Sequence, residues 1–206
     1  MNFQTACRAL CQQILEHFAT ALGIKCDWFS SRHDETQGPS GTVFRLLYYP
    51  QLDNHNAAGE DIRAGAHSDY GSITLLFQQI GQPGLEIKTP SGEWKAVPVD
   101  PLFHGTGGPT PLPILVNIGD LLQDWTGGLL KSTVHRVIFP VEEGLRGDRY
   151  SMAYFCHPLD DALLEAVPSE LVREHSAGRL GGKADGRVIT AKDHVMRRLA
   201  ATYDVS

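Results

Sequence analysis

The sequence predicts a mainly β fold with flanking helices, either a sandwich or a barrel-like jelly roll. From about residue 43 to 157 the chain consists of short runs rich in β-branched and aromatic residues, separated by glycine and proline. No helix-length segments alternate with these runs, which argues against βα units. Helical periodicity is confined to the two ends of the chain. The expected strands lie in TVFRLLYYP, SITLLFQQ, GLEIK, EWKAVPV, PILVNIGD, STVHRVIFP and RYSMAYFCHP.

Apolar side chains recur at helical spacing near the N-terminus, and Gly23 is a natural stop. We therefore expect an amphipathic helix over residues 3–22 that covers a sheet. Residues 27–42 are expected to form a loop. The apolar positions of the helix are Phe3, Cys7, Leu10, Ile14, Phe18 and Leu22.

A second helix is expected over about residues 191–203, in TAKDHVMRRLAATY. Thr190 and Asp193 are spaced as a capping box in which aspartate replaces the usual glutamate. Between the strands, residues 103–113 are interpreted as a loop insertion and residues 142–148 as a long hairpin tip. Residues 168–189, which contain the glycine-rich SAGRLGGKADGR, are expected to be mobile.

Composition limits the possible partners. The 206 residues fit a single domain spanning 1–206, with a strand core over about 43–158. The net charge is −6, from 18 basic and 24 acidic residues, and no basic, aromatic-studded stripe is present. Nucleic acid is therefore not an expected partner. No signal peptide and no run of eighteen apolar residues is found, and the four cysteines form no CxxC pair. We expect a reduced, cytoplasmic protein that does not enter a membrane.

The stretch AGAHSDYGSITLLF carries the first candidate metal ligands. His67 and Asp69 are two residues apart, and side chains on a strand alternate between faces, so both are expected to project together. A lone His-x-Asp is more often a turn or a satisfied hydrogen bond than a metal site. The second part is His135, which lies inside the apolar run of STVHRVIFP. Burial of an imidazole there costs roughly a few kcal/mol unless the ring is hydrogen-bonded or ligated.

Together these residues supply two imidazoles, one carboxylate and no thiolate. This is the ligand set that holds Fe(II) on one face and leaves positions open for other ligands. Nitrogen donors with one hard oxygen also suit other divalent ions, so the ligand types alone do not fix the metal.

A candidate anion site lies in RYSMAYFCHP, where alternate residues from 149 to 157 share one strand face. An arginine that points into the interior stays charged and needs an anion. Arg149, with the hydroxyl of Ser151 two residues on, makes a pocket for a carboxylate. A structural salt bridge to one of the chain's own acids is an equally good reading of Arg149 alone.

These motifs, in this order, resemble the catalytic part of the iron- and 2-oxoglutarate-dependent oxygenases. The similarity runs from FRLLYYP through AHSDYGSITLLFQ, PGLEI, GEW, LVNIGDLLQDWTGG and STVHRV to RYSMAYFCHP, and more loosely to the last helix. Within that superfamily the chain is most similar to the branch that contains isopenicillin N synthase. The fold that the resemblance implies is the double-stranded β-helix, a jelly roll or cupin-like barrel.

The resemblance also implies roles for particular residues. His67, Asp69 and His135 would be the catalytic iron ligands, and Arg149 and Ser151 would bind the distal carboxylate of 2-oxoglutarate. Tyr49 would be a further contact to that cosubstrate. Two residues match positions that often touch substrate in relatives, namely Phe155 and His157. The implied activity is oxidation of a small organic molecule, most often by hydroxylation, that consumes molecular oxygen and releases succinate and carbon dioxide. The residues do not separate hydroxylation from desaturation or ring closure.

Three departures from the family pattern stand out. Leu47 lies where relatives often carry an asparagine, which removes one polar contact to the cosubstrate. The segment between Asp69 and His135 is longer than is usual in the family, and the expected insertion at 103–113 accounts for it. The chain also opens at the helix before the strands, without the N-terminal region common in relatives.

Two other functions remain open on these residues. An iron oxidase of the same fold that does not use 2-oxoglutarate would carry the same Arg-x-Ser pair. A truncated jelly-roll module that binds a metal but catalyses nothing would also fit. The substrate and the oligomeric state are not determined by the sequence.

Overall fold

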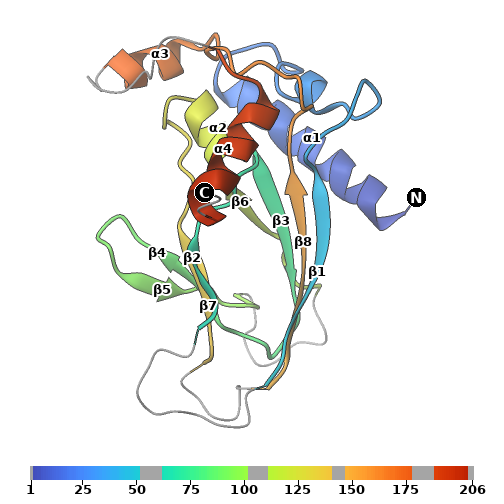
Figure 1. Cartoon of the computed structure of the whole chain (residues 1–206), viewed down its shortest axis with the longest axis vertical. Coiled ribbons are helices and arrows are strands. Elements are labelled where there is room, and N and C mark those ends of the chain that lie inside the picture. The colour runs from blue at the N-terminus through green and yellow to red at the C-terminus, as the bar shows by residue number, and fades with distance from the viewer. Residues whose placement is uncertain (1, 52–61, 102–110, 141–146, 178–187, 204–206) are drawn as a thin grey trace.

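The computed structural model describes residues 2–51, 62–101, 111–140, 147–177 and 188–203. Within these residues, eight strands form two four-stranded antiparallel sheets, with helices on one outer face and at one end (Figure 1). The expectation of a mainly β fold with flanking helices is therefore confirmed.

The first sheet has the strand order β1-β8-β3-β6 and the second the order β2-β7-β4-β5. Neighbouring strands are thus distant in sequence, and β8 lies between β1 and β3. The first sheet contains β1 (Val43–Tyr49), β8 (Arg149–Cys156), β3 (Ile73–Gln78) and β6 (Leu115–Ile118). The second sheet contains β2 (Ile62–His67), β7 (His135–Ile138), β4 (Leu85–Lys88) and β5 (Trp94–Ala96).

The helix expected over residues 3–22 is present as α1 (Phe3–Ala21), and it covers the outer face of the first sheet. Asn2 caps it by accepting a hydrogen bond from the Thr5 amide at 2.8 Å. The face that α1 buries is narrower than the sequence pattern predicted, because Phe3 remains 43% exposed. The buried positions recur every four residues: Cys7, Cys11, Leu15 and Ala19.

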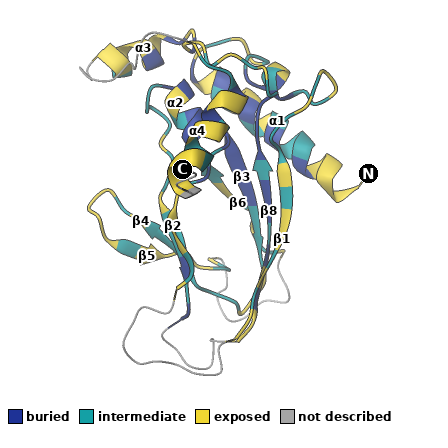
Figure 2. Ribbon diagram, in the orientation of Figure 1, coloured by how far each residue is buried: buried dark blue, intermediate teal, exposed yellow. Residues whose placement is uncertain are grey.

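The main hydrophobic core lies between α1 and the outward side chains of β3 and β8. The burial pattern in Figure 2 follows this arrangement, with the two central strands largely buried and the β4–β5 hairpin mostly intermediate or exposed. The strand residues of this core are Ile73, Leu75, Tyr154 and Cys156. Because successive side chains alternate along β8, the opposite side chains of the same strand face the space between the sheets.

The expected C-terminal helix is present as α4 (Ala191–Tyr203). Its capping box forms as expected: the Asp193 amide donates to Thr190 Oγ1 at 3.1 Å, and the Thr190 amide donates to Asp193 Oδ2 at 3.3 Å. α4 packs against α2 (Asp120–Trp125).

Four elements were not predicted from the sequence. β2 contains IRAGAH, in which alanine and glycine replace the β-branched residues that mark a strand. α2 spans only six residues directly after a β-branched run. A short 3₁₀ helix, Ser30–His33, interrupts the stretch interpreted as loop.

The fourth is α3 (Glu170–Ala177), which lies in the stretch that was expected to be mobile. Val172 is the buried residue of this helix. Within that stretch, residues 178–187 lie outside the described residues. So does most of the expected insertion at 103–113 and of the hairpin tip at 142–148.

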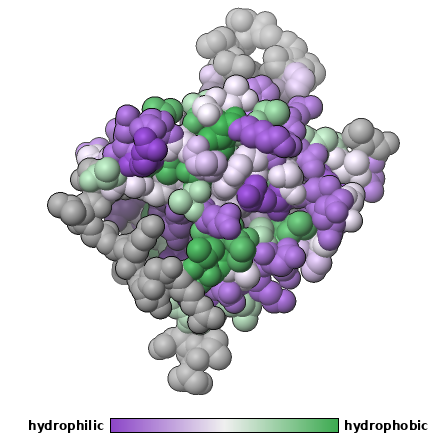
Figure 3. All heavy atoms as spheres, turned by 90° about the horizontal axis from the view of Figure 1, so that it is seen from above, coloured by the Kyte–Doolittle hydropathy of each residue, from purple (hydrophilic) through white to green (hydrophobic). Residues whose placement is uncertain are grey.

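No helix in the described part of the chain is long and apolar enough to cross a membrane. The face seen from above in Figure 3 is largely hydrophilic and carries separate hydrophobic patches.

His33 links the 3₁₀ helix to the turn that precedes β3. Its Nδ1 lies 2.7 Å from the Phe29 carbonyl oxygen, which can only accept, so Nδ1 donates and Nε2 accepts from Ser72 Oγ at 2.9 Å. The ring is 3% exposed, and burial lowers the pKa of His33 from 6.5 to about 4. The neutral imidazole is therefore part of the folded structure.

We predict that stability falls as the pH drops below 6.5. The unfolded chain protonates His33 near its ordinary pKa of 6.5, whereas the folded chain resists protonation until about pH 4. The contribution of the neutral ring is complete above pH 6.5 and decreases by about 3 kcal/mol as the pH approaches 4. Thermal unfolding followed between about pH 8 and pH 5 measures this slope. The H33Q variant keeps a donor and an acceptor but loses the titration, so its slope should be shallower. Equal slopes in the two proteins would contradict the prediction.

Candidate active site

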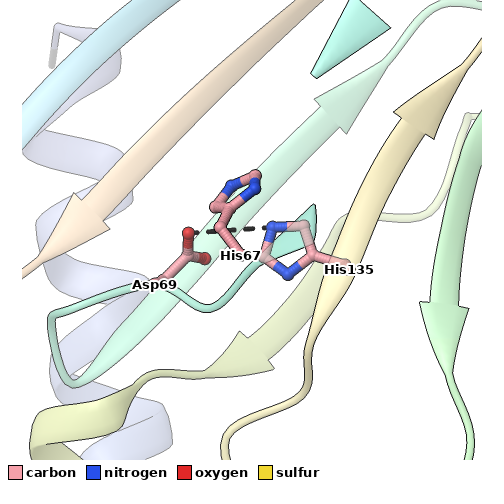
Figure 4. Close-up of side chains that lie close together, drawn as sticks. All are labelled: His67, Asp69 and His135. Carbon is pink, nitrogen blue, oxygen red and sulfur yellow. Dashed lines mark ion pairs between the residues drawn. The ribbon is translucent and has the colours of Figure 1, made fainter. Parts of the chain in front are cut away.

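Three side chains from two segments of the chain converge at one end of the space between the sheets (Figure 4). His67, Asp69 and His135 each offer a ligand atom, and these atoms lie within 4.8 Å of one another. His135 Nε2 is 3.8 Å from Asp69 Oδ1, and the two imidazole centroids are 4.4 Å apart. No other group of this kind occurs among the described residues. Three donor atoms this close together could hold a single cation.

The structural reason for this convergence differs from the one predicted. Strand alternation was expected to aim His67 and Asp69 together, but this explanation is wrong. β2 ends at His67, β3 begins only at Ile73, and Asp69 lies in the turn between them. His67 instead meets His135 as its cross-strand partner in the β2–β7 pair, and Asp69 reaches the two rings from the turn.

Both imidazoles are oriented by backbone carbonyls. His67 Nδ1 lies 2.7 Å from the Gly65 oxygen, and His135 Nδ1 lies 3.0 Å from the Thr133 oxygen. A carbonyl oxygen only accepts, so each Nδ1 carries the hydrogen and each Nε2 keeps its lone pair free. Hydrogen bonds of this kind fix the tautomer and the ring orientation of metal-binding histidines.

Hydrogen bonds from two side chains orient the Asp69 carboxylate. Its Oδ2 accepts hydrogen bonds from Thr74 Oγ1 and from Asn117 Nδ2, both at 2.7 Å. Oδ1 faces His135 and retains its lone pairs. Two neutral donors occupy one oxygen and leave the other oxygen available to a cation, as a monodentate carboxylate ligand would require.

The backbone of the turn is docked on the N-terminus of α2. The amides of Gly119 and Asp120 donate to the carbonyls of Ser72 and Asp69 at 2.9 and 2.7 Å. A Cβ at position 119 would lie 2.3 Å from the Gly71 oxygen, so this approach requires glycine. The free amides at the start of the helix thus hold the main chain of the carboxylate ligand.

A cavity of about 90 Å³ extends from these three residues between the sheets. Its walls are mostly apolar and include Leu76, Leu85, Ile87, Leu115 and Val137. Arg149 and Ser151 also line it. A cavity of this lining, with polar groups gathered at particular points, is typical of a small-molecule site.

Arg149 is 1% exposed and forms no ion pair with a carboxylate in the described part of the chain. One terminal nitrogen lies 3.3 Å from Ser151 Oγ and the other 3.5 Å from Gln78 Oε1. Its Nε has no hydrogen-bond partner among the residues described. Burial lowers the pKa of the guanidinium, because desolvation penalises the cation. The structure therefore offers no internal salt bridge for Arg149 in the described residues, and an anion in the cavity would fit it.

The other expected site residues lie at different distances from this cavity. Tyr49 lines it, with the Arg149 guanidinium 5.4 Å from its ring centroid. Phe155 also lines it, as does Leu47. His157 does not: it is buried against Gly41 and Gly71, outside the cavity wall, and burial lowers its pKa to about 4.

Sequence reasoning missed the residues that support the ligands. Thr74 and Asn117 were read only as parts of strands, and Asp120 only as part of a family motif. The available signal was the motif LVNIGD, which sets an amide, a glycine and a carboxylate close together after a buried strand. Arg45 was also missed. It shares the inward face of β1, because it pairs with Ala153, and its guanidinium lies 5.7 Å from the Phe155 ring.

The fold and site together define a class of protein: a two-sheet β protein with two histidines and one carboxylate arranged to hold a metal beside a small cavity. Residues 40–158 match the model of the 2OG-Fe(II) oxygenase superfamily. The chain belongs to this superfamily, as its motifs predicted. Fe(II) and 2-oxoglutarate are the cofactors of the superfamily. The two imidazoles and the carboxylate are compatible with Fe(II), and the buried guanidinium of Arg149 is compatible with a carboxylate of 2-oxoglutarate.

Individual relatives support the same conclusion. A UPF0676 protein of Schizosaccharomyces pombe is 36% identical over 210 residues, covering 100% of this chain and 57% of that protein. A proline hydroxylase of Petromyces alliaceus is 30% identical over 205 residues, covering 98% of this chain and 58% of that protein. A full-length Neurospora crassa protein, crystallised with α-ketoglutarate and thymine, has a TM-score of 0.75 and 34% identity, covering 98% of this chain and 55% of that one. The chain thus spans a little over half the length of the relatives that it matches.

We predict that T74V weakens metal binding by about 10-fold, because the isosteric valine removes one of the two donors that orient Asp69. Titration of the apo-protein with Mn(II), followed by the electron paramagnetic resonance of the free ion, measures the dissociation constant. The matched control is T20V, which changes an exposed threonine of α1 in the same way. Equal Mn(II) affinities of T74V and the unmodified protein would refute the proposed role of Thr74.

Proposed function

We propose that this chain is the catalytic part of a Fe(II)- and 2-oxoglutarate-dependent oxygenase that hydroxylates a small organic molecule. The observation that carries the proposal is a single cavity with a candidate metal centre at one end and a buried, unpaired guanidinium in its wall, within the described residues. The products are the oxidised substrate, succinate and carbon dioxide.

In this proposal His67, Asp69 and His135 hold Fe(II) through Nε2, Oδ1 and Nε2. Their hydrogen bonds to Gly65, Thr74 and Thr133 keep these atoms directed at one point. When bound there, Fe(II) supplies the oxygen chemistry that couples decarboxylation of 2-oxoglutarate to oxidation of the substrate.

Arg149 and Ser151 bind the distal carboxylate of 2-oxoglutarate. The guanidinium offers its unpartnered Nε and two terminal nitrogens, and the hydroxyl lies beside it. A charge-assisted pair in an apolar cavity is strong because water does not compete for it. Tyr49 closes the wall beside Arg149.

The substrate contacts Phe155, whose ring lies on the cavity side of β8 next to Thr74 on β3. The Arg45 guanidinium over this ring adds a positive charge to the same side of the site. The burial of His157 outside the cavity wall gives no support to a substrate contact there.

Two further parts of the proposal concern the fold and the substrate class. The strand orders β1-β8-β3-β6 and β2-β7-β4-β5 support a double-stranded β-helix. In that fold the chain crosses repeatedly from one sheet to the other. One relative described above is named for hydroxylation of proline and another was crystallised with thymine, which supports a small, polar organic substrate.

The proposal is tested without knowledge of the substrate. Under anaerobic conditions, addition of Fe(II) and 2-oxoglutarate to the apo-protein should produce a visible charge-transfer band, and admission of oxygen should yield slow succinate formation. We predict that H67A and D69A lose both signals, because each removes a metal ligand. H17A, which alters an exposed histidine of α1, should retain both.

A second prediction separates the two cofactors. In R149Q the affinity for 2-oxoglutarate should fall by at least about 10-fold while Mn(II) affinity is unchanged, because the lost interaction is a charge-assisted pair at the cosubstrate only. Isothermal titration of the Mn(II)-loaded protein with 2-oxoglutarate measures this. Metal binding without any 2-oxoglutarate binding would favour an iron oxidase that does not use this cosubstrate. Metal binding without oxygen consumption would favour a non-catalytic module.

A further inference from the structure

The C-terminal helix contacts the turn that carries the carboxylate ligand. Arg198 of α4 forms an ion pair with Asp120, with a nitrogen–oxygen distance of 2.7 Å. The same Asp120 oxygen accepts a hydrogen bond from Ser68 Oγ at 3.0 Å, and Arg198 lies 3.4 Å from that hydroxyl. Ser68 immediately precedes Asp69, so a continuous set of polar contacts runs from α4 to the residue next to the ligand.

A second contact anchors the other side of Asp69. The hydroxyl groups of Tyr70 and Thr202 lie 2.6 Å apart, and the Arg198 guanidinium is 5.7 Å from the Tyr70 ring. Thr202 and Arg198 are four residues apart on one face of α4, and Thr202 Oγ1 also donates to the Arg198 carbonyl at 3.0 Å. The residues on both sides of Asp69 are therefore bound to the same helix face.

Asp120 makes the arrangement sensitive to Arg198. Its side chain is 9% exposed, and its own amide donates to the Asp69 carbonyl at 2.7 Å. Removal of Arg198 would leave a buried carboxylate without its cationic partner, directly beneath the ligand turn. Ser68 Oγ donates to the same carboxylate oxygen, so the loss of Arg198 would change the hydrogen bonding that holds the turn, and the position of Asp69 with it.

α4 makes little contribution to the hydrophobic core. Of its described side chains only Ala191 and His194 are buried, and Met196 is 57% exposed. The helix lies across the end of the sheets where β2 stops, against α2 (Figure 1). Its connection to this region includes the polar contacts with the turn and the approach of His194 Nδ1 to Asp124 Oδ2 of α2 at 3.6 Å.

From these contacts we infer that Arg198 is a positioning residue of the metal centre, acting through Asp120 and Ser68, with Tyr70 and Thr202 as a second support. The inference rests on the proposed function, because it states that α4 holds Asp69 Oδ1 in the position where it can bind the same metal ion as the two histidines. Outer contacts that orient metal ligands typically change metal affinity by about 10- to 100-fold when they are removed.

The test is Mn(II) binding to the full chain, followed by the resonance of the free ion. R198A should raise the dissociation constant about 10-fold, R198K should restore part of the loss, and the double variant Y70F/T202V should show a smaller loss in the same direction. The matched control is R197A, which removes the neighbouring exposed arginine of α4 and should bind Mn(II) as the unmodified protein does.

Two further measurements separate positioning from general destabilisation. Loss of the Asp120 partner should lower the thermal midpoint of R198A below that of R197A, but the R198A apo-protein should remain fully folded at the temperature of the Mn(II) titration, as circular dichroism checks. The affinity of the Mn(II)-saturated R198A protein for 2-oxoglutarate should be unchanged, because Arg149 and Ser151 lie on β8, away from the turn. Unaltered Mn(II) affinity in R198A, or a loss that R197A shares, overturns the inference and leaves the proposed function intact. Absence of Mn(II) binding in the unmodified protein overturns both.

Discussion

The geometry of this site depends on the docking of one turn against the start of one short helix. Residues 69–72 present their carbonyl groups to the amides of residues 119–121, and the absence of a side chain at Gly119 allows the two backbones to meet. This contact fixes the main chain of Asp69, while Thr74 and Asn117 fix its carboxylate. The imidazoles then need only the cross-strand pairing of β2 with β7 to come within reach.

The sheets and α1 form the cavity that extends from this contact. α1 covers the outer face of the first sheet, which leaves the inner faces of β3 and β8 to form the cavity. The polar side chains inside the cavity are few and each has a defined position. Arg149 differs from the others because its charge is not neutralised within the described residues, which is a state that an anionic ligand relieves.

Much of this organisation was predictable from the sequence. The terminal helices, seven of the strands and the three candidate ligands follow from periodicity, turn residues and the chemistry of His67, Asp69 and His135. The reason given for the pairing of His67 with Asp69 was wrong, because the period-2 rule was applied across the end of a strand.

The parts that were missed depend on contacts between distant segments. β2 escaped prediction because residues 64–66 carry no strand signal, and its pairing is supplied by β7. The roles of Thr74, Asn117 and Arg198 arise from contacts across 5, 48 and 130 positions, and of these three only Asn117 has a sequence signal, in the motif LVNIGD.

The alternation of side chains along β8 has a consequence for how such a protein can diversify. Arg149, Ser151, Ala153 and Phe155 line the cavity, whereas Tyr154 and Cys156 pack under α1. Substitution at a cavity position alters the ligand environment without touching the packing, but insertion or deletion of one residue would exchange the two sets of side chains along the rest of the strand. New ligand specificity can therefore arise along this strand by substitution of single residues, but not by insertion or deletion of a residue.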